Sequence, residues 1–334
     1  MGEWGVIAAL TGRMPAGPLT SVGIGDDAAV IGAPSGSVVA AVDLLLEGRH
    51  FRRDWSSAYD IGVKAAARSL ADIAAMGAVN TALLVALAVP GALAASWPLE
   101  LADGLAAEAA RAGAGIAGGD TARADSVLLS VTALGDLAGR RPVLRSGARP
   151  GDLIAVAGPL GRSAAGLALL SAGLADGRPA PEGLAGLITA HRRPSPPYQA
   201  GPEAATLGAT AMIDVSDGLL ADLGHIADAS AVALDIDGSS LVTAGPLGEA
   251  AAFLRSRKFD SSRTDPAGSP PPTALEWVLT GGEDHSLVAT FPAATQLPSR
   301  WRVIGHVRAP DDNGPGVTVD GAPHAGPPGW QHFR

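Results

Sequence analysis

The strongest constraint on the fold is a regular alternation of apolar, β-type segments with segments of helical periodicity. In "AYDIGVKAAARSLADIAAMGA", Ala66, Leu70 and Ile73 recur at helical spacing before Gly77 ends the pattern. The strands expected in the first half are residues 28–31, residues 38–46, "TALLVALAV", "GIAGG" and residues 127–134. Further helices are expected over residues 3–10 and about 98–112. The second half repeats the pattern in "DLIAVAG", a helix over about 163–174, "AMIDVSDGLLADLGHIA" and "VALDID". This alternation predicts an α/β (α+β) domain in each half of the chain.

A domain boundary is expected near residue 148. The stretch "GRRPVLRSGARPGD" is rich in Arg, Gly and Pro, which is typical of a connection between domains. We therefore predict an N-terminal domain over residues 1–148 and a C-terminal domain over residues 149–334. Residues 255–272 are rich in Ser, Pro, Asp and Gly, so we expect a flexible insertion there.

Composition excludes several classes of protein. The chain has 334 residues, of which 47% are hydrophobic, and this is ample material for a packed core. A formal net charge of -9 argues against a nucleic-acid binder, because the phosphate backbone would be repelled. The absence of Cys excludes disulfides, thiolate metal sites and cysteine nucleophiles. Prolines interrupt the longest uncharged run, residues 79–99, and Glu3 stands where a signal peptide would carry positive charge, so we expect no membrane association and a cytoplasmic protein.

Acidic residues gather at strand ends and turns, bracketed by Gly and apolar residues. They are Asp26, Asp27, Asp43, Asp120, Asp214, Asp217, Glu283 and Asp284. In "GIGDDAAVIG" the acidic pair taken alone indicates only a turn into a strand. Repeated at several strand ends, however, buried carboxylates would be costly without cations. Mg²⁺ is held by a few carboxylates and completes its shell with water and phosphate oxygens, so this pattern favours a magnesium site.

Two other motifs bear on ligand binding. Gly118, Gly119 and Asp120 follow an apolar strand and suit the close approach of a phosphate. The chain has no G-x-x-x-x-G-K-[ST] sequence, which excludes a P-loop. "GPLGRSAAG" lacks the spacing of a dinucleotide loop, and its glycines are expected to pack a helix onto a sheet. Asp72 lies four residues after Arg68 on the long helix, which by itself predicts an ordinary ion pair. Its place near the helix C-terminus disfavours an anion unless a cation is near.

Seven of these motifs together resemble a known family. They are "GIGDDAAV", "VDLLLEGRHF", "KAAARSLADIAAMGA", "GGDTA", "LRSGARPGD", "MIDVSDGLLADLGHIA" and "GGEDH". Their order and spacing are similar to those of the thiamine-monophosphate kinase family, within the aminoimidazole ribonucleotide synthetase-like superfamily. The resemblance covers almost the whole chain, apart from residues 255–272. It implies a two-domain fold in which the N-terminal sheets of two subunits pair into a barrel, and therefore a homodimer.

The resemblance also implies an activity. The expected reaction is in-line transfer of the γ-phosphoryl group of ATP onto thiamine monophosphate, which gives thiamine diphosphate. The acceptor is already an ionised phosphate oxygen, so no protein nucleophile is expected; positioning and several Mg²⁺ ions would suffice.

The site residues implied by the resemblance fall into three groups. The metal ligands would be Asp27, Asp43, Asp72, Asp120, Asp214 and Asp217. Gly119, Asp120, Arg145 and Ser216 would face ATP. His50, Glu283 and Trp330 would face thiamine monophosphate. Of the acidic pair, Asp27 is expected to meet metal and Asp26 to shape the loop.

Two departures from the family pattern leave alternatives open. Relatives commonly carry Ser or Thr hydroxyls at the positions of Ala41 and Val42, and some carry an aromatic residue near Arg111 and Ala112. The first difference predicts weaker metal sites and the second weaker nucleotide binding. Ala41 and Val42 therefore leave a non-catalytic dimeric nucleotide-binding protein as an alternative to the kinase. The same superfamily offers a second alternative, an ATP-dependent synthetase with another phosphorylated substrate.

Overall fold

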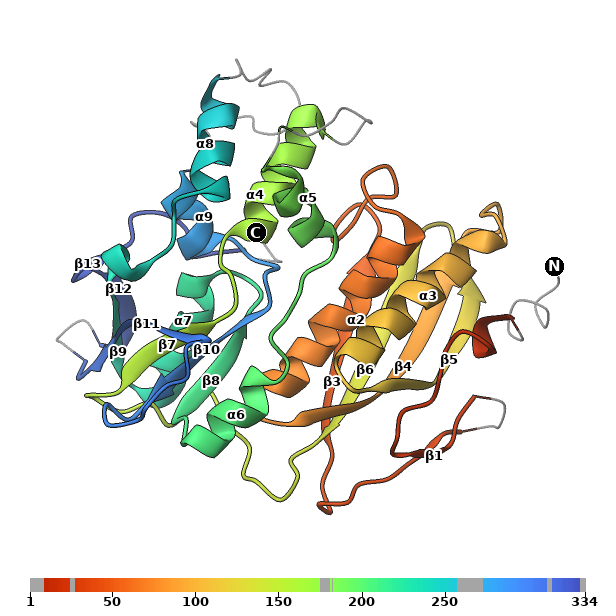
Figure 1. Cartoon of the computed structure of the whole chain (residues 1–334), viewed down its shortest axis with the longest axis horizontal. Coiled ribbons are helices and arrows are strands. Elements are labelled where there is room, and N and C mark those ends of the chain that lie inside the picture. Colours follow the sequence, from red (N-terminus) through yellow and green to blue (C-terminus); the bar gives the residue numbers. More distant parts are fainter. Residues whose placement is uncertain are drawn as a thin grey trace. The chain divides into compact units, whose positions relative to one another are not determined.

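The protein, taken here from a computed structural model, is described over residues 9–24, 28–174, 181, 183–256, 273–310 and 314–330. Contacts within the chain divide it into two compact units (Figure 1). The first comprises Met1–Pro142 and Tyr198–Thr206, and the second comprises Val143–Pro197 and Leu207–Arg334. None of the helices in the described ranges has the length and apolar character needed to cross a membrane.

The first unit is built on a four-stranded sheet with two helices on one face (Figure 1). The strand order is β3-β6-β4-β5, and a short antiparallel ribbon of β1 and β2 lies outside this sheet. The strands are β1 (Thr20–Val22), β2 (Val30–Ile31), β3 (Val39–Leu46), β4 (Val79–Val89), β5 (Gly115–Arg123) and β6 (Leu128–Asp136). The helices are α2 (Ala58–Ala75) and α3 (Ser96–Arg111). Each expected strand and long helix of this half is thus present, and the helix expected over residues 3–10 lies almost wholly outside the described residues.

Local sequence explains how α2 begins and how closely it packs. Ser57 and Asp60 form a reciprocal capping box, each accepting the other's backbone N–H at 3.1 Å. Gly62 faces α3 so closely that an added Cβ would lie 2.1 Å from the carbonyl oxygen of Leu101. Gly104 of α3 is in the same position against Tyr59, at 2.2 Å. The two helices therefore pack backbone to backbone, which only glycine permits at these positions.

Residues 198–206 join the first unit although they are distant from it in sequence. The Tyr198 hydroxyl donates to Glu108 of α3 at 2.6 Å, and the guanidinium of Arg111 lies 4.6 Å from the Tyr198 ring centroid. Helix α6 (Ala200–Leu207) follows, with Gly201 packed against the Ala74 carbonyl of α2. The first unit is therefore discontinuous in sequence, which a boundary drawn at one residue could not anticipate.

The second unit is built on a seven-stranded mixed sheet. Its strand order is β13-β12-β9-β11-β7-β10-β8. The strands are β7 (Leu153–Ala157), β8 (Ala211–Val215), β9 (Ala233–Ile236), β10 (Ser286–Phe291), β11 (Trp301–Arg308), β12 (Gly316–Val319) and β13 (Ala322–Pro323). The helices are α4 (Arg162–Leu169), continued by a π-type turn over Leu170–Leu174, α5 (Ala185–Arg192), α7 (Leu219–Ser230), α8 (Pro246–Ser256) and α9 (Ala274–Thr280), with a 3₁₀ turn at Gly238–Ser240. Arg255 and Ser256 close α8 instead of opening the expected loop; residues 257–272 lie outside the described part. The α/β fold class expected from the alternation is confirmed.

Candidate active site

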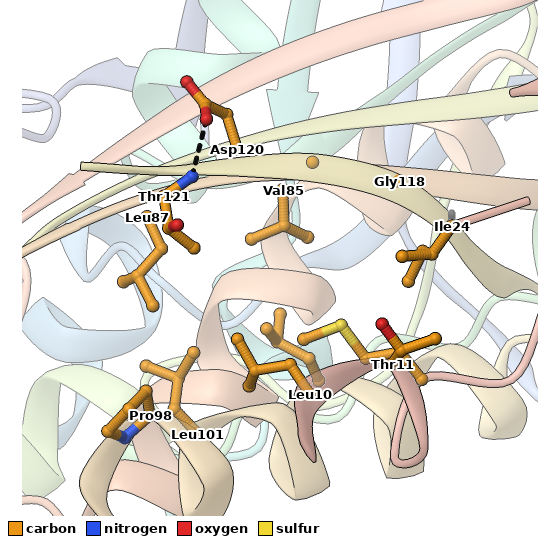
Figure 2. A pocket seen from close by; sticks show the side chains of 13 residues that line it. Leu10, Thr11, Ile24, Val85, Leu87, Pro98, Leu101, Gly118, Asp120 and Thr121 are labelled. Carbon is orange, nitrogen blue, oxygen red and sulfur yellow. Dashed lines mark hydrogen bonds between the residues drawn. The ribbon is translucent and has the colours of Figure 1, made fainter. Parts of the chain in front are cut away.

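A pocket in the first unit lies between the sheet and α3 (Figure 2). Its cavity volume is about 160 Å³, and its walls are mostly apolar. Val85 and Leu87 of β4 line one side, and Leu101 of α3 lies opposite (Figure 2). The edge of the pocket is residues 118–121 of β5, the "GGDT" stretch. The structure thus places Gly119 and the backbone of Asp120 beside an apolar cavity.

Gly119 is held tightly in this strand. A Cβ added to it would lie 1.9 Å from the carbonyl oxygen of Val85, which is backbone and cannot move aside cheaply. A side chain here would push β5 away from β4 and deform the rim of the pocket.

Asp43 and Asp120 point to opposite faces of this sheet. Across the strands, Asp43 is in register with Val131, Val85 and Gly119, whereas Asp120 is in register with Ala86. Because directly paired residues share a face and successive residues alternate, Asp120 lies on the face away from Asp43. Figure 2 shows the Asp120 carboxylate on the far side of β5 from the pocket. Two strands also separate the two residues, about 14 Å at the usual strand spacing. Within one chain these two carboxylates cannot bind the same cation.

Asp43 is held by helix α2. The Ser69 hydroxyl, fully buried, donates to its Oδ2 at 2.8 Å, and the Arg68 guanidinium lies 3.8 Å from its Oδ1. Asp72 follows Ser69 by three residues and Arg68 by four along α2. It therefore shares the helix face that meets Asp43. Asp43 and Asp72 therefore belong to one acidic region between β3 and α2.

The two positions that lack the family's hydroxyls differ in orientation. Ala41 shares the face of Asp43, while Val42 points to the opposite face and is 64% exposed. The hydroxyl that does reach Asp43 comes instead from Ser69.

His50 lies in the turn after β3. Its Nδ1 accepts the backbone N–H of Leu46 at 3.0 Å. The ring is therefore oriented by its own turn, with Nε2 as the nitrogen left to donate when the ring is neutral.

In the second unit, four of the predicted residues lie next to one another. Ser216 accepts the backbone N–H of Glu283 at 2.8 Å, and Asp217 accepts that of Trp330 at 2.9 Å through its carbonyl oxygen. Gly329 approaches the same carbonyl so closely that a Cβ would lie 2.3 Å from it. The "SDG" loop, the "GGEDH" loop and the C-terminal Trp330, which is 58% exposed, thus form one region at the end of β8.

Asp222, which sequence analysis missed, organises this region. Its Oδ2 accepts the backbone N–H groups of Ser216, Asp217 and Gly218 at 3.0 to 3.1 Å. Burial, and next the charge of Asp214, raise the pKa of Asp222 to about 8, against these hydrogen bonds, which lower it. An acidic residue in the first turn of a helix was the available signal, because anions are stabilised there.

The "GGEDH" loop has an unusual backbone, and its last two residues are buried. Glu283 and His285 adopt positive φ angles of 67° and 52°. The fully buried Asp284 carboxylate accepts the N–H groups of Gly161 at 2.5 Å and Ser163 at 2.8 Å, at the start of α4. Burial raises the pKa of Asp284 to about 7. These two bonds hold the start of α4 on the "GGEDH" loop. Of the "GPLG" glycines, which were expected to pack a helix onto a sheet, Gly161 lies against the backbone of Trp277 in α9 and Gly158 against Ser286 of β10.

Asp214 is buried beside His285. His285 is a second residue of this region that was not predicted as a site residue. The imidazole Nδ1 lies 3.1 Å from Asp214 Oδ2.

Arg145 is not brought to Ser216. Its carbonyl oxygen accepts a hydrogen bond from the hydroxyl of Ser230, the last residue of α7. Ser216 lies at the other end, just before the first residue of that helix. The twelve residues of α7 span about 18 Å, further than an arginine side chain reaches.

The remaining predicted ligand, Asp27, lies outside the described residues. Among those that are described, no three His, Cys, Asp or Glu side chains come close enough together to form a metal site. The predicted ligands lie in separate places: Asp43 and Asp72 between β3 and α2, Asp214 and Asp217 close enough to Asp222 for their charges to raise its pKa, and Asp120 on the other face of the first sheet.

Comparison with known proteins gives the family. Residues 25–137 match the family model described as AIR synthase related protein, N-terminal domain. The thiamine-monophosphate kinase of Mycobacterium tuberculosis (strain H37Rv) is 46% identical over 336 residues, covering 100% of this chain and 92% of the relative. The chain belongs to the thiamine-monophosphate kinase family.

Solved structures agree with this assignment. The thiamine-monophosphate kinase of Stenotrophomonas maltophilia K279a has a TM-score of 0.77 and 34% identity, covering 96% of this chain and 98% of that one. A second structure, AaThiL complexed with AMPPCP and TMP, has a TM-score of 0.75 and 30% identity. The match covers 99% of this chain and 97% of that one. The resemblance inferred from the seven motifs is thereby confirmed.

Proposed function

We propose that this protein catalyses ATP-dependent phosphorylation of thiamine monophosphate to thiamine diphosphate. The relatives that it matches along its whole length are thiamine-monophosphate kinases, and one similar structure is a complex with AMPPCP and TMP. The observation that carries the proposal is the meeting of Ser216, Asp217, Glu283 and Trp330 at one end of β8. This region combines carboxylates for cations with an exposed indole on which a cationic ring can stack.

The apolar pocket of the first unit is proposed to receive the base of ATP. Its volume is below the about 300–1,000 Å³ typical of pockets for whole ligands, so it suits one apolar moiety. The glycines of β5 at its rim leave backbone accessible to the phosphates that follow the base. Gly119, Asp120 and Ser216 are proposed to face the nucleotide. Arg145 is also proposed to bind ATP, but at a position distant from Ser216.

Magnesium is proposed as the counter-charge for the phosphates. The donor set is made of carboxylates, which suits a hard cation. Burial is the main cause of the raised pKa of Asp222, and the charge of Asp214 is the second; a cation beside Asp214 would offset that second effect. Pairs rather than triads of carboxylates are compatible with Mg²⁺, which keeps several water and phosphate ligands. The proposed ligands are Asp27, Asp43, Asp72, Asp120, Asp214 and Asp217, distributed over more than one ion because Asp43 and Asp120 face apart.

The chain's own residues would act by orientation. The acceptor oxygen of thiamine monophosphate is ionised at neutral pH, so the site needs no general base. His50, Glu283 and Trp330 are proposed to hold the acceptor, with Glu283 fixed by its backbone hydrogen bond to Ser216. In-line geometry between two anionic chains then depends on positioning.

We also propose a cytoplasmic homodimer. Val42, Leu44 and Leu46 project from β3 on the side away from α2, and they are 64%, 53% and 37% exposed. An apolar strand at a sheet edge with its outer face uncovered is a surface that proteins usually bury. A second copy of the same sheet supplies a matching surface by symmetry.

One incubation tests the activity. Purified protein is mixed with ATP, Mg²⁺ and thiamine monophosphate, and thiamine diphosphate and ADP are followed by chromatography. Stoichiometric formation of both is expected. ATP cleavage without thiamine diphosphate would favour a synthetase acting on another phosphorylated molecule. ATP binding without turnover at high protein concentration would favour a non-catalytic nucleotide-binding protein.

A further inference from the structure

We propose that His285 is a positioning residue for Asp214: its Nδ1–H donates to Asp214 Oδ2 and holds the carboxylate in the orientation that binds a divalent cation. The inference rests on the proposed function, in which Asp214 is a metal ligand. It assigns a role to the last residue of the "GGEDH" motif, for which the resemblance implied none.

Burial and distance carry the first step. The His285 side chain is 2% exposed and the Asp214 side chain 7%. Nδ1 and Oδ2 are 3.1 Å apart, within hydrogen-bond range. In so dry a place this contact is not exchanged for water, so it restricts the rotation of the carboxylate.

The other ring nitrogen identifies the donor. His285 Nε2 is buried and has no hydrogen-bond partner among the described residues. A buried N–H without an acceptor is strongly disfavoured, so the neutral ring keeps its proton on Nδ1 and leaves Nε2 bare. His285 therefore donates to Asp214, and Asp214 accepts as a carboxylate.

The backbone conformation of the loop holds the His285 ring in this position. His285 sits at φ 52°, a conformation that most side chains adopt only at a cost, and Glu283 two residues earlier does the same. The backbone N–H of His285 donates to the Val215 carbonyl at 2.9 Å, which ties the loop to the end of β8 next to Asp214. The strained loop and the hydrogen bond together fix the ring against the carboxylate.

As a consequence, the two carboxylate oxygens of Asp214 have different partners. Oδ2 is occupied by the imidazole, and Oδ1 is left for the cation. Hydrogen bonds of this kind orient metal-ligating carboxylates, and their loss typically costs about 10–100-fold in metal affinity or activity.

The test measures metal binding by the full chain, independently of turnover. Mn²⁺ is titrated into the protein and free Mn²⁺ is followed by electron paramagnetic resonance. Asp214→Asn defines which bound Mn²⁺ depends on Asp214. For that ion, His285→Leu is expected to weaken binding about 10-fold or more.

Two further variants separate positioning from packing. His285→Asn keeps a side-chain N–H close to the place of Nδ1, and Asn tolerates positive φ, so affinity within about threefold of wild type is expected. His191→Leu removes the buried histidine of α5, whose Nδ1 lies 3.1 Å from the Ser163 hydroxyl, and should leave Mn²⁺ binding unchanged.

The outcomes are distinct. Wild-type affinity in His285→Leu, or equal weakening in His285→Leu and His285→Asn, overturns the positioning role. Unchanged binding in Asp214→Asn overturns both this role and the proposed ligand set. A protein that forms no thiamine diphosphate but shows the expected order of Mn²⁺ affinities would disprove the kinase proposal alone.

Discussion

Replacing Asp284 by Asn should remove a pH-dependent part of the stability of the second unit. The fully buried carboxyl has its pKa raised by burial from the ordinary 3.8 to about 7. Between these values it is protonated in the folded protein and ionised in the unfolded chain. The folded state then binds one more proton, so its stability falls as pH rises from about 4 to about 7 and levels off above.

The magnitude follows from the same pKa difference. At about 1.4 kcal/mol for each pKa unit, the whole contribution is about 4 kcal/mol. Between pH 4.5 and pH 8, about 3 kcal/mol of it should be lost. Asp222, whose pKa is raised to about 8, adds a decrease of the same sign, but it is present in both proteins and cancels in their difference.

The assay is urea unfolding of wild type and Asp284→Asn at several pH values between 4.5 and 8, followed by tryptophan fluorescence. Trp277 and Trp301 are buried in the same unit as Asp284 and report on it. Asn keeps only one of the two hydrogen bonds to α4, so a constant loss of stability is expected as well. The stability advantage of wild type should shrink by about 3 kcal/mol on going from pH 4.5 to pH 8. Parallel stability curves for the two proteins would refute the argument that burial keeps this carboxyl neutral.

Three further substitutions address the proposed sites. Ser69→Ala should lower the free energy of unfolding by about 2 kcal/mol and raise the Mg²⁺ concentration for half-maximal turnover, because the hydroxyl that donates to Asp43 is lost. As a control, Ser163→Ala removes an equally buried hydroxyl and should change stability only. Gly119→Ala should raise the KM for ATP at least severalfold, since its Cβ would meet the Val85 carbonyl, whereas Gly224→Ala, with nothing within 4 Å, should not; equal KM values would remove β5 from the nucleotide site. Leu44→Lys should convert a dimer into monomers in sedimentation velocity, while Val303→Lys, on the exposed part of β11, should not, and a wild-type monomer would contradict the proposed interface.

Much of the fold could be predicted because each element is specified by its own neighbours in sequence. The 3.6-residue spacing of Ala66, Leu70 and Ile73 gives α2, and the capping residues Ser57 and Gly77 place its ends. The discontinuity of the first unit could not be predicted, because it depends on Tyr198 meeting Glu108 ninety positions earlier. Such a contact leaves no local periodicity in either segment.

The sequence by itself determined the helices and strands around the motifs, the family and the kinds of side chain in the site, whereas α5, α6, α8, α9 and β10 to β13 were not predicted from it. The identity and order of seven short motifs are enough for this, since each motif is local. Only the tertiary structure decided which carboxylates can act together. Strand register turns Asp43 and Asp120 to opposite faces of one sheet, and α7 holds Arg145 away from Ser216. The pairing of His285 with Asp214 has the same origin: 71 positions separate them, and they meet only because β8 and the loop before β10 pack side by side.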